Sequence, residues 1–208
     1  MHYDPRQGKP KELPHNPFTS LVVPRPIGWI STLSEDGVNN LAPYSFFNAV
    51  SSNPPFVMFA AHPLKDSQAN AEKTGEFTVS MAVYPLREQM NETAREFEIE
   101  ESEPEAVGIE MAPSVNVRPP RVAASPIALE CLYNATVPLV TSAGQRTDAS
   151  VVIGEVVGIY IDDAVLVDGM VDLALANPIS RLGYLNYGVI GETFRMRKPP
   201  GTRERRRA

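Results

Sequence analysis

Two stretches of the sequence gather side chains whose types could bind a phosphorylated ring compound. In the first, residues 24–55, aromatic side chains are interleaved with hydroxyls and amides. In the second, residues 65–70, Lys65 comes just before a segment that is expected to begin a helix. A lysine ammonium attracts a phosphate as a point charge, and the free N–H groups at a helix start, near Ser67, point at an anion. Asp66 suits an anion site less well, and its type favours a helix N-cap.

This composition suits flavin mononucleotide (FMN). Its isoalloxazine ring needs apolar or aromatic walls, its ribityl chain needs hydroxyl and amide partners, and its phosphate needs N–H groups and a cation. Each feature also has an ordinary structural explanation. Trp29 fits a hydrophobic core equally well, residues 51–55 fit a simple turn, and Lys65 fits a solvated surface. Composition alone therefore leaves both interpretations open.

The sequence lacks the residues of most self-sufficient catalytic sites. It has three histidines, His2, His15 and His62, and one cysteine, Cys131, which are too few for a zinc-type cluster. Cys131 lies within an apolar β pattern, where a small buried residue is the expected role. No nucleophile elbow, phosphate-binding loop or dinucleotide-binding glycine motif occurs. If the protein is an enzyme, a bound cofactor is expected to supply the reactive atoms.

Length and composition are those of one globular domain. The 208 residues are 43% hydrophobic and 21% charged, with no apolar run long enough to span a membrane. The first residues show no secretory signal, and the single cysteine favours a reducing, cytoplasmic location. A net charge of −6 argues against nucleic-acid binding. Basic residues gather after residue 194, and residues 199–208 are expected to form a disordered tail.

Short apolar segments and twenty prolines predict a β-rich fold. Residues 27–33 and 38–44 flank a Ser-Glu-Asp-Gly turn and are expected to pair as a hairpin. Residues 56–61 form a continuous apolar run, which is typical of a strand buried on both faces. Further strands are expected at residues 77–82, 127–137 and 151–161, and a second hairpin is expected at residues 164–175 around Asp168-Gly169.

Two helices are also expected. Residues 67–74 end at Gly75, a residue favoured just after a helix C-terminus, and residues 86–97 place apolar side chains on one face. The acid-rich residues 96–105 are expected to form a solvated loop, and residues 1–20 an extended arm. Because strands and helices do not alternate regularly, the pattern favours a closed or split antiparallel barrel over a parallel, doubly wound sheet.

Five blocks of the sequence are distinctive when taken together. They are PRPIGWIST at 24–32 with NLAPYSFFNAVSSNPP at 40–55, KDSQAN at 65–70 with TGEF at 74–77, VRPPRVAASPIALEC at 117–131, IGEVVGIYI at 153–161 and PISRLGYLNY at 178–187. In these blocks the chain resembles the flavin reductase-like family of FMN-binding split barrels, to which flavoredoxin-type proteins belong. The resemblance runs from about residue 18 to residue 194. The first and last blocks are the most specific.

This resemblance implies a mainly β fold with small α insertions, a six-stranded Greek-key split barrel. It also implies a homodimer with one FMN near each subunit boundary. Residues 1–17 would be an N-terminal arm and residues 18–198 the FMN-binding domain. The family binds flavin through one strand, a loop at residues 45–52, a turn at residues 65–67, and a later segment that closes over the flavin. On this sequence the positions are Trp29, Ser31, Thr32, Ser45, Phe47, Asn48, Ser51, Ser52, Lys65, Asp66, Ser67, Arg181 and Tyr187.

The resemblance further implies a flavin reductase that passes a hydride from NAD(P)H to the flavin and supplies reduced flavin to a partner such as a monooxygenase. Two alternatives stay open: a flavoredoxin-type protein that exchanges electrons with a protein partner, and a non-catalytic FMN-binding protein. Hydride transfer from nicotinamide C4 to flavin N5 needs two rings stacked at about 3–3.5 Å and no protein acid or base. That requirement agrees with the lack of a nucleophile–base pair in the sequence. No motif indicates whether NADH or NADPH is preferred.

Overall fold

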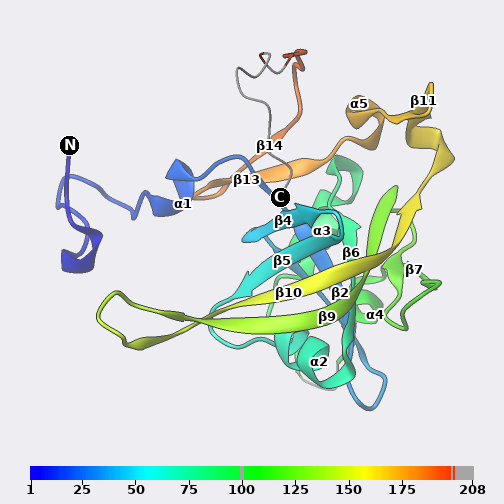
Figure 1. Cartoon of the computed structure of the whole chain (residues 1–208), viewed down its shortest axis with the longest axis horizontal. Helices are drawn as coiled ribbons and strands as arrows, with labels where there is room; N and C mark the ends of the chain where they lie inside the picture. Colours follow the sequence, from blue (N-terminus) through cyan, green and yellow to red (C-terminus); the bar gives the residue numbers. More distant parts are fainter. Residues whose placement is uncertain (99–100, 198, 200–208) are drawn as a thin grey trace, which may run out of the picture.

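The computed structural model describes residues 1–98, 101–197 and 199 and has a mainly β fold with short helices (Figure 1). The predicted tail at residues 199–208 therefore lies outside the described residues, except for its first position. Within residues 1–17 the one regular element is η1 (Pro5–Gln7), and Figure 1 shows this arm projecting from the rest of the chain.

A seven-stranded antiparallel sheet forms the centre of the fold. Its order is β3-β2-β6-β9-β10-β5-β4. The strands are β2 (Gly28–Leu33), β3 (Asn39–Tyr44), β4 (Phe47–Ser52), β5 (Pro55–Ala61), β6 (Glu76–Met81), β9 (Ile127–Val140) and β10 (Arg146–Ile161). The first predicted hairpin and the four further predicted strands are confirmed. β9 and β10 form one long hairpin that extends beyond the predicted strand ends.

The sheet curls because its two edge strands are joined directly to each other. β3 ends at Tyr44 and β4 begins at Phe47, so only Ser45 and Phe46 connect opposite edges of the sheet. A chain spans at most about 3.3–3.6 Å per residue, so these strand ends lie no more than about 11 Å apart. No ladder between β3 and β4 closes the sheet in the part of the chain that the structure describes. The fold is thus a split barrel, with seven sheet strands where the resemblance implied six.

Three smaller sheets lie beside the barrel. They are formed by β1 (Arg25–Pro26), β13 (Ile179–Gly183) and β14 (Asn186–Val189), by β7 (Met111–Ala112) and β8 (Arg121–Val122), and by β11 (Leu166–Val167) and β12 (Met170–Val171). Figure 1 shows β13 and β14 standing away from the barrel. The predicted hairpin at Asp168-Gly169 is confirmed but short. β12 stops at Val171 because Asp172 caps a helix there and accepts the N–H groups of Ala174 and Leu175.

The helices are short and lie between the strands. They are α1 (Phe18–Leu21), α2 (Asp66–Thr74), η2 (Tyr84–Leu86), α3 (Arg87–Glu92), α4 (Glu103–Val107), η3 (Asp163–Val165) and α5 (Leu173–Ala176). α2 confirms the first predicted helix, and Gly75 follows it with a φ of 77°, a left-handed conformation that glycine adopts without a Cβ clash. Among the described residues, no helix is long and apolar enough to cross a membrane.

Two predictions between residues 86 and 105 are wrong. The helix expected to reach residue 97 ends at Glu92, where the Thr93 hydroxyl donates to the Met90 carbonyl at 2.9 Å and the chain leaves the helical path. Residues 99–100 of the acid-rich segment lie outside the described residues. The rest is only partly a solvated loop, because α4 begins at Glu103 and that side chain is 6% exposed. Its carboxylate can be buried because two residues of β3, Asn40 and Leu41, donate hydrogen bonds to it.

The structure also differs from two predictions about residues 47–61. β5 is not buried on both faces: Val57, Phe59 and Ala61 are buried, whereas the residues between them are half-buried. Residues 47–52, expected as part of a binding loop, form the edge strand β4, and most of their side chains are exposed. An edge strand is paired on one side only, so its side chains need not follow a strong apolar pattern.

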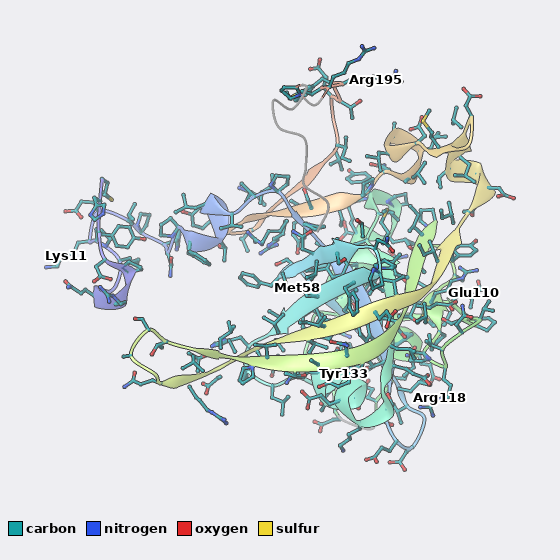
Figure 2. All side chains as sticks on the ribbon, viewed as in Figure 1. Lys11, Met58, Glu110, Arg118, Tyr133 and Arg195 are labelled. Atoms are coloured by element: carbon teal, nitrogen blue, oxygen red, sulfur yellow. The ribbon has the colours of Figure 1, made fainter. Side chains whose placement is uncertain are left out.

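Two apolar clusters fill the interior of the protein. In the first, the rings of Phe59 and Phe77 meet edge to face with centroids 5.5 Å apart. Tyr133 of β9, labelled in Figure 2, packs against this cluster. The second cluster contains Trp29 and Met90. Burial of each large apolar side chain contributes about 1.5–3 kcal/mol, so the clusters hold the strands in register.

Cys131 provides a test of this core. It is fully buried in the first cluster, and burial raises the pKa of its thiol. Because the thiolate is the reactive form, we expect no reaction of the native protein with DTNB in mildly alkaline buffer. Unfolding in guanidinium should then release one reactive thiol per chain. Native-state labelling at the rate of free cysteine would contradict this placement of β9.

Candidate functional site

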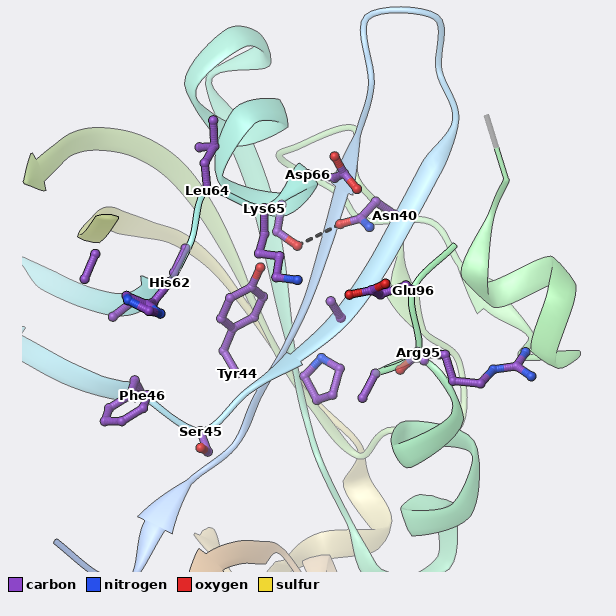
Figure 3. Close-up of a pocket in the computed structure, with 18 of the residues that line it drawn as sticks. Asn40, Tyr44, Ser45, Phe46, His62, Leu64, Lys65, Asp66, Arg95 and Glu96 are labelled. Atoms are coloured by element: carbon purple, nitrogen blue, oxygen red, sulfur yellow. Dashed lines mark hydrogen bonds between the residues drawn. The ribbon is translucent and has the colours of Figure 1, made fainter. Parts of the chain in front are cut away.

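A cleft of about 1200 Å³ opens where the two edges of the barrel meet (Figure 3). Its walls come from β3, the Ser45-Phe46 link, the end of β5 with the residues that lead into α2, residues 93–97 after α3, and Glu103 of α4. Pockets for drug-sized ligands measure about 300–1,000 Å³, so the cleft is large enough for a mononucleotide cofactor.

One end of the cleft has the features of an anion site. Lys65 lines the cleft as the N-cap of α2, and no ion pair among the described residues includes it. The first N–H groups of a helix lack intrahelical partners, and the helix dipole adds partial positive charge there. Figure 3 shows the Lys65 amine and the Tyr44 hydroxyl pointing into the same space. The chemistry of this end suits a phosphate.

Acidic side chains oppose that positive charge. Asp66 is not the N-cap predicted from the sequence: it is the first helical residue, and α2 has no side-chain cap. An acid in the first turn stabilises a helix through its dipole but repels a bound anion. Besides Tyr44, six charged or titratable residues line the cleft: His62, Lys65, Asp66, Arg95, Glu96 and Glu103. In the part of the chain that is described, no group of three potential metal ligands occurs.

A buried chain of hydrogen bonds lies behind Lys65. Ser67 Oγ donates to Asn40 Oδ1 at 2.7 Å, Asn40 Nδ2 donates to the Glu103 carboxylate, and the Leu41 N–H donates to the same carboxylate at 3.0 Å. Ser67, Asn40 and Glu103 are each less than a tenth exposed. Burial raises the pKa of Glu103, and the hydrogen bonds from Leu41 and Asn40 oppose that rise. The chain ties α2, β3 and α4 together.

Tyr44 adds a neutral hydroxyl to the same end of the cleft. Its ring packs on Phe59 with centroids 4.8 Å apart. Burial raises the pKa of Tyr44 to about 12; a hydrogen bond with Ser67 acts against the rise, and the Asp66 and Glu103 carboxylates add to it. The hydroxyl therefore stays protonated at neutral pH, where it can form hydrogen bonds but cannot act as a base.

Part of the remaining cleft wall is apolar. Phe46 and Leu64 are exposed although they are large and apolar, and both line the cleft. Phe18, Phe97 and Leu139 complete this surface. Large apolar side chains that remain exposed around a hollow are typical of a ligand site. This part of the cleft suits a flat ring.

Four of the predicted binding residues line the cleft, and three others are buried in the barrel. The four are Ser45, Lys65, Asp66 and Ser67. Trp29, Ser31 and Thr32 of β2 are fully buried. The Trp29 indole donates to Thr93 Oγ1 at 2.9 Å, and Thr93 lines the cleft. Trp29 therefore reaches the cleft through Thr93 and not by contact of its own ring.

The remaining predicted residues do not line the cleft. Phe47 packs against the first core cluster. Three others are exposed on β4: Asn48, Ser51 and Ser52. Arg181 of β13 and Tyr187 of β14 are register partners, and the guanidinium lies 4.4 Å from the centre of the Tyr187 ring.

Sequence reasoning did not select several residues that line the cleft. Asn40 and Tyr44 stand in one of the distinctive blocks, and the interleaving of rings with amides was a usable signal for both. Glu103 looks like every other acid in its run, and only its burial distinguishes it. His62 is exposed, as expected for a loop histidine, yet it also lines the cleft.

Comparison with known families shows the family of this chain. The model of the flavin reductase like domain matches residues 20–176. The chain belongs to the flavin reductase-like family. An uncharacterized protein of Aquifex aeolicus is 38% identical over 169 residues, which cover 78% of this chain and 83% of that protein.

Two solved structures resemble this flavin reductase-like chain over nearly its whole length. Nitrilotriacetate monooxygenase component B from Bacillus cereus has a TM-score of 0.86 and 28% identity, covering 94% of this chain and 98% of that chain. The 2-nitrobenzoate 2-nitroreductase of Pseudomonas fluorescens has a TM-score of 0.80 and 29% identity, covering 97% and 100%. This chain therefore shares its fold with both of these structures.

Proposed function

We propose that this flavin reductase-like chain binds FMN in the cleft and passes a hydride from NAD(P)H to the flavin. The observation that carries the proposal is Lys65 and the start of α2 at one end of a cleft that also exposes large apolar side chains such as Phe46 and Leu64. This arrangement supports a flavin with a terminal phosphate. It favours FMN over FAD, because the sequence has no dinucleotide-binding glycine motif for an adenosine half.

In this proposal the residues of the chain bind and orient the reactants. Lys65 and the first N–H groups of α2 hold the phosphate, while Phe46 and Leu64 keep water away from the ring. Ser45 offers a hydroxyl to a polar edge of the ligand. Bound FMN supplies the hydride-accepting N5. Tyr44 contributes a neutral hydroxyl and no base, which suits a transfer that depends on the stacking of two rings.

The name of one structural relative supports a proposal for the electron acceptor. Similarity to a monooxygenase component supports delivery of reduced flavin to a partner oxygenase. The alternatives are a flavoredoxin-type protein that exchanges electrons with another protein, and a non-catalytic FMN-binding protein. A free, buried cysteine fits a reducing compartment, so a cytoplasmic location belongs to the same proposal.

The visible spectrum of the purified protein, followed by anaerobic reduction, tests the function. We expect FMN to be bound and its absorbance to bleach rapidly when NADH or NADPH is added. Slow bleaching by both nucleotides, with fast reduction by a protein donor, would instead favour the flavoredoxin-type alternative. No turnover with any donor would leave an FMN-binding protein. A colourless chain that takes up no FMN, or one that holds FAD alone, would refute the site.

Replacement of Lys65 by alanine tests the phosphate end. The charge-assisted contact is worth roughly 1.5–3 kcal/mol, so FMN affinity should fall about tenfold to a hundredfold. Riboflavin, which lacks the phosphate, should bind Lys65→Ala and wild type alike. Lys73→Ala is the matched control, because Lys73 is exposed on the same helix and pairs with Glu35. Unchanged FMN affinity in a titration of Lys65→Ala would mean that Lys65 is an ordinary surface lysine.

The same proposal includes a homodimer. The β13-β14 hairpin projects from the barrel (Figure 1) and exposes large apolar side chains, among them Leu185, Tyr187 and Val189. A monomer rarely leaves such a surface in water, so a second copy of the chain is the expected cover. Arg181 and Tyr187 lie outside the cleft of their own chain, and a role for them at the flavin therefore requires the cleft of the partner.

Light scattering tests the assembly. We expect the wild type to be a dimer and Leu185→Glu, at a side chain that is 88% exposed, to be a monomer with weaker FMN binding. Val115→Glu is the matched control: Val115 is 89% exposed on a loop beside the barrel and should leave the dimer intact. A wild-type monomer that holds FMN with full affinity would refute a shared site.

A further inference from the structure

Glu103 is a buried carboxylate for which the proposed function has no use. It is 6% exposed, it lines the cleft, and it lies at the start of α4, far along the chain from the other residues of the anion end. Its two oxygens accept the Leu41 N–H and the Asn40 amide. A buried carboxylate is costly unless it is hydrogen-bonded, and here both donors come from the neighbouring strand β3.

The carboxylate determines which way the Asn40 amide faces. An ionised carboxylate only accepts hydrogen bonds, so the Asn40 NH₂ must face Glu103 and the Asn40 oxygen must face the other way. That oxygen accepts the Ser67 hydroxyl at 2.7 Å and lies 3.3 Å from the Thr32 hydroxyl. With the opposite orientation, the amide would present its NH₂ to Ser67 and its oxygen to Glu103, where two acceptors would face each other.

Ser67 in turn is the second residue of α2, two positions after the N-cap Lys65. Its hydroxyl is fixed by Asn40, and the side chain is 1% exposed. The position of the first N–H groups of α2 against β3 therefore depends on a relay from Glu103 through Asn40 to Ser67. Each link is a direct hydrogen bond, and the relay ends at the turn where the phosphate is proposed to bind.

We propose that Glu103 is a positioning residue for the phosphate end of the flavin site and sets the preference for FMN over unphosphorylated flavin. This inference rests on the proposed FMN site. Glu103 acts through Asn40 and Ser67 and need not touch the ligand. α4 thus serves as a support for the Lys65-to-Ser67 turn, although it is distant from that turn in the sequence.

The sign of a mutational effect separates this role from a merely electrostatic one. A carboxylate near a phosphate repels it, so removal of the charge alone would strengthen FMN binding. Loss of the relay would weaken FMN binding, because the turn from Lys65 to Ser67 would no longer be held in place for the phosphate. Glu103→Gln removes the charge and keeps the shape, but with its oxygen on the Leu41 N–H its NH₂ faces the Asn40 NH₂. Either that contact is lost, or the Asn40 amide turns over and donates to Ser67 instead of accepting from it, so the wild-type relay is broken or reversed.

FMN and riboflavin titrations of the purified full-length protein test this role. In Glu103→Gln we expect FMN affinity to fall about tenfold, as for one lost hydrogen bond in a buried network, and riboflavin affinity to stay unchanged. Glu105→Gln, an exposed acid two positions along α4, should match the wild type for both ligands. A rise in FMN affinity in Glu103→Gln, or an equal fall for both ligands, would overturn the proposal.

A double-mutant cycle with Ser67→Ala tests the route of the effect. If Glu103 acts through Ser67, Ser67→Ala should also weaken FMN selectively, and the double variant should be no weaker than the weaker single variant. Additive losses would overturn the relay. If Glu103→Gln fails to fold, Ser67→Ala decides alone, because an equal loss of FMN and riboflavin would contradict a phosphate-specific turn. Wild-type protein that binds riboflavin and FMN equally would refute the phosphate site itself, and with it the proposed function.

Discussion

The structure depends on the two-residue connection between β3 and β4. These strands are the opposite edges of a seven-stranded sheet, and Ser45 and Phe46 alone join them. The chain cannot span more than a few ångströms per residue, so the sheet must curl until its edges almost meet. Because no ladder joins the edges in the described chain, a seam remains, and the cleft lies along it. A barrel closed by hydrogen bonds would leave no such opening.

An open seam exposes polar backbone and side-chain groups to a partly dry environment, where an unpaired group is costly. The chain satisfies them with residues from distant elements. Glu103 of α4 accepts the Leu41 N–H of β3, and Asn40 accepts the Ser67 hydroxyl of α2. The bonds that make the seam stable are therefore the same bonds that shape the anion end of the cleft. This overlap explains why a residue with no direct ligand contact can influence the proposed binding site.

The sequence predicted the parts of this arrangement that depend on local pattern. Apolar runs located β2, β5, β6, β9 and β10, and Gly75 located the end of α2, because period and turn chemistry are local properties. β4 was missed because an edge strand needs little apolar patterning. Glu103 was missed because its burial depends on partners more than 60 residues away. Trp29 was assigned to the flavin by resemblance, whereas its ring lies in the core and its indole bonds Thr93.

The charges around the cleft bear on how firmly it could hold a flavin phosphate. Arg95 is directed to Glu92, with which it pairs at 3.4 Å, and it lies over the Phe97 ring, so Lys65 is the cation that remains for a ligand. Asp66, Glu96 and Glu103 lie in the same walls. One available cation among three carboxylates gives an anion site weaker than a wholly basic one, since each nearby acid repels the phosphate. Under the proposed function such moderation is useful, because a reductase that serves a partner oxygenase must release its reduced flavin.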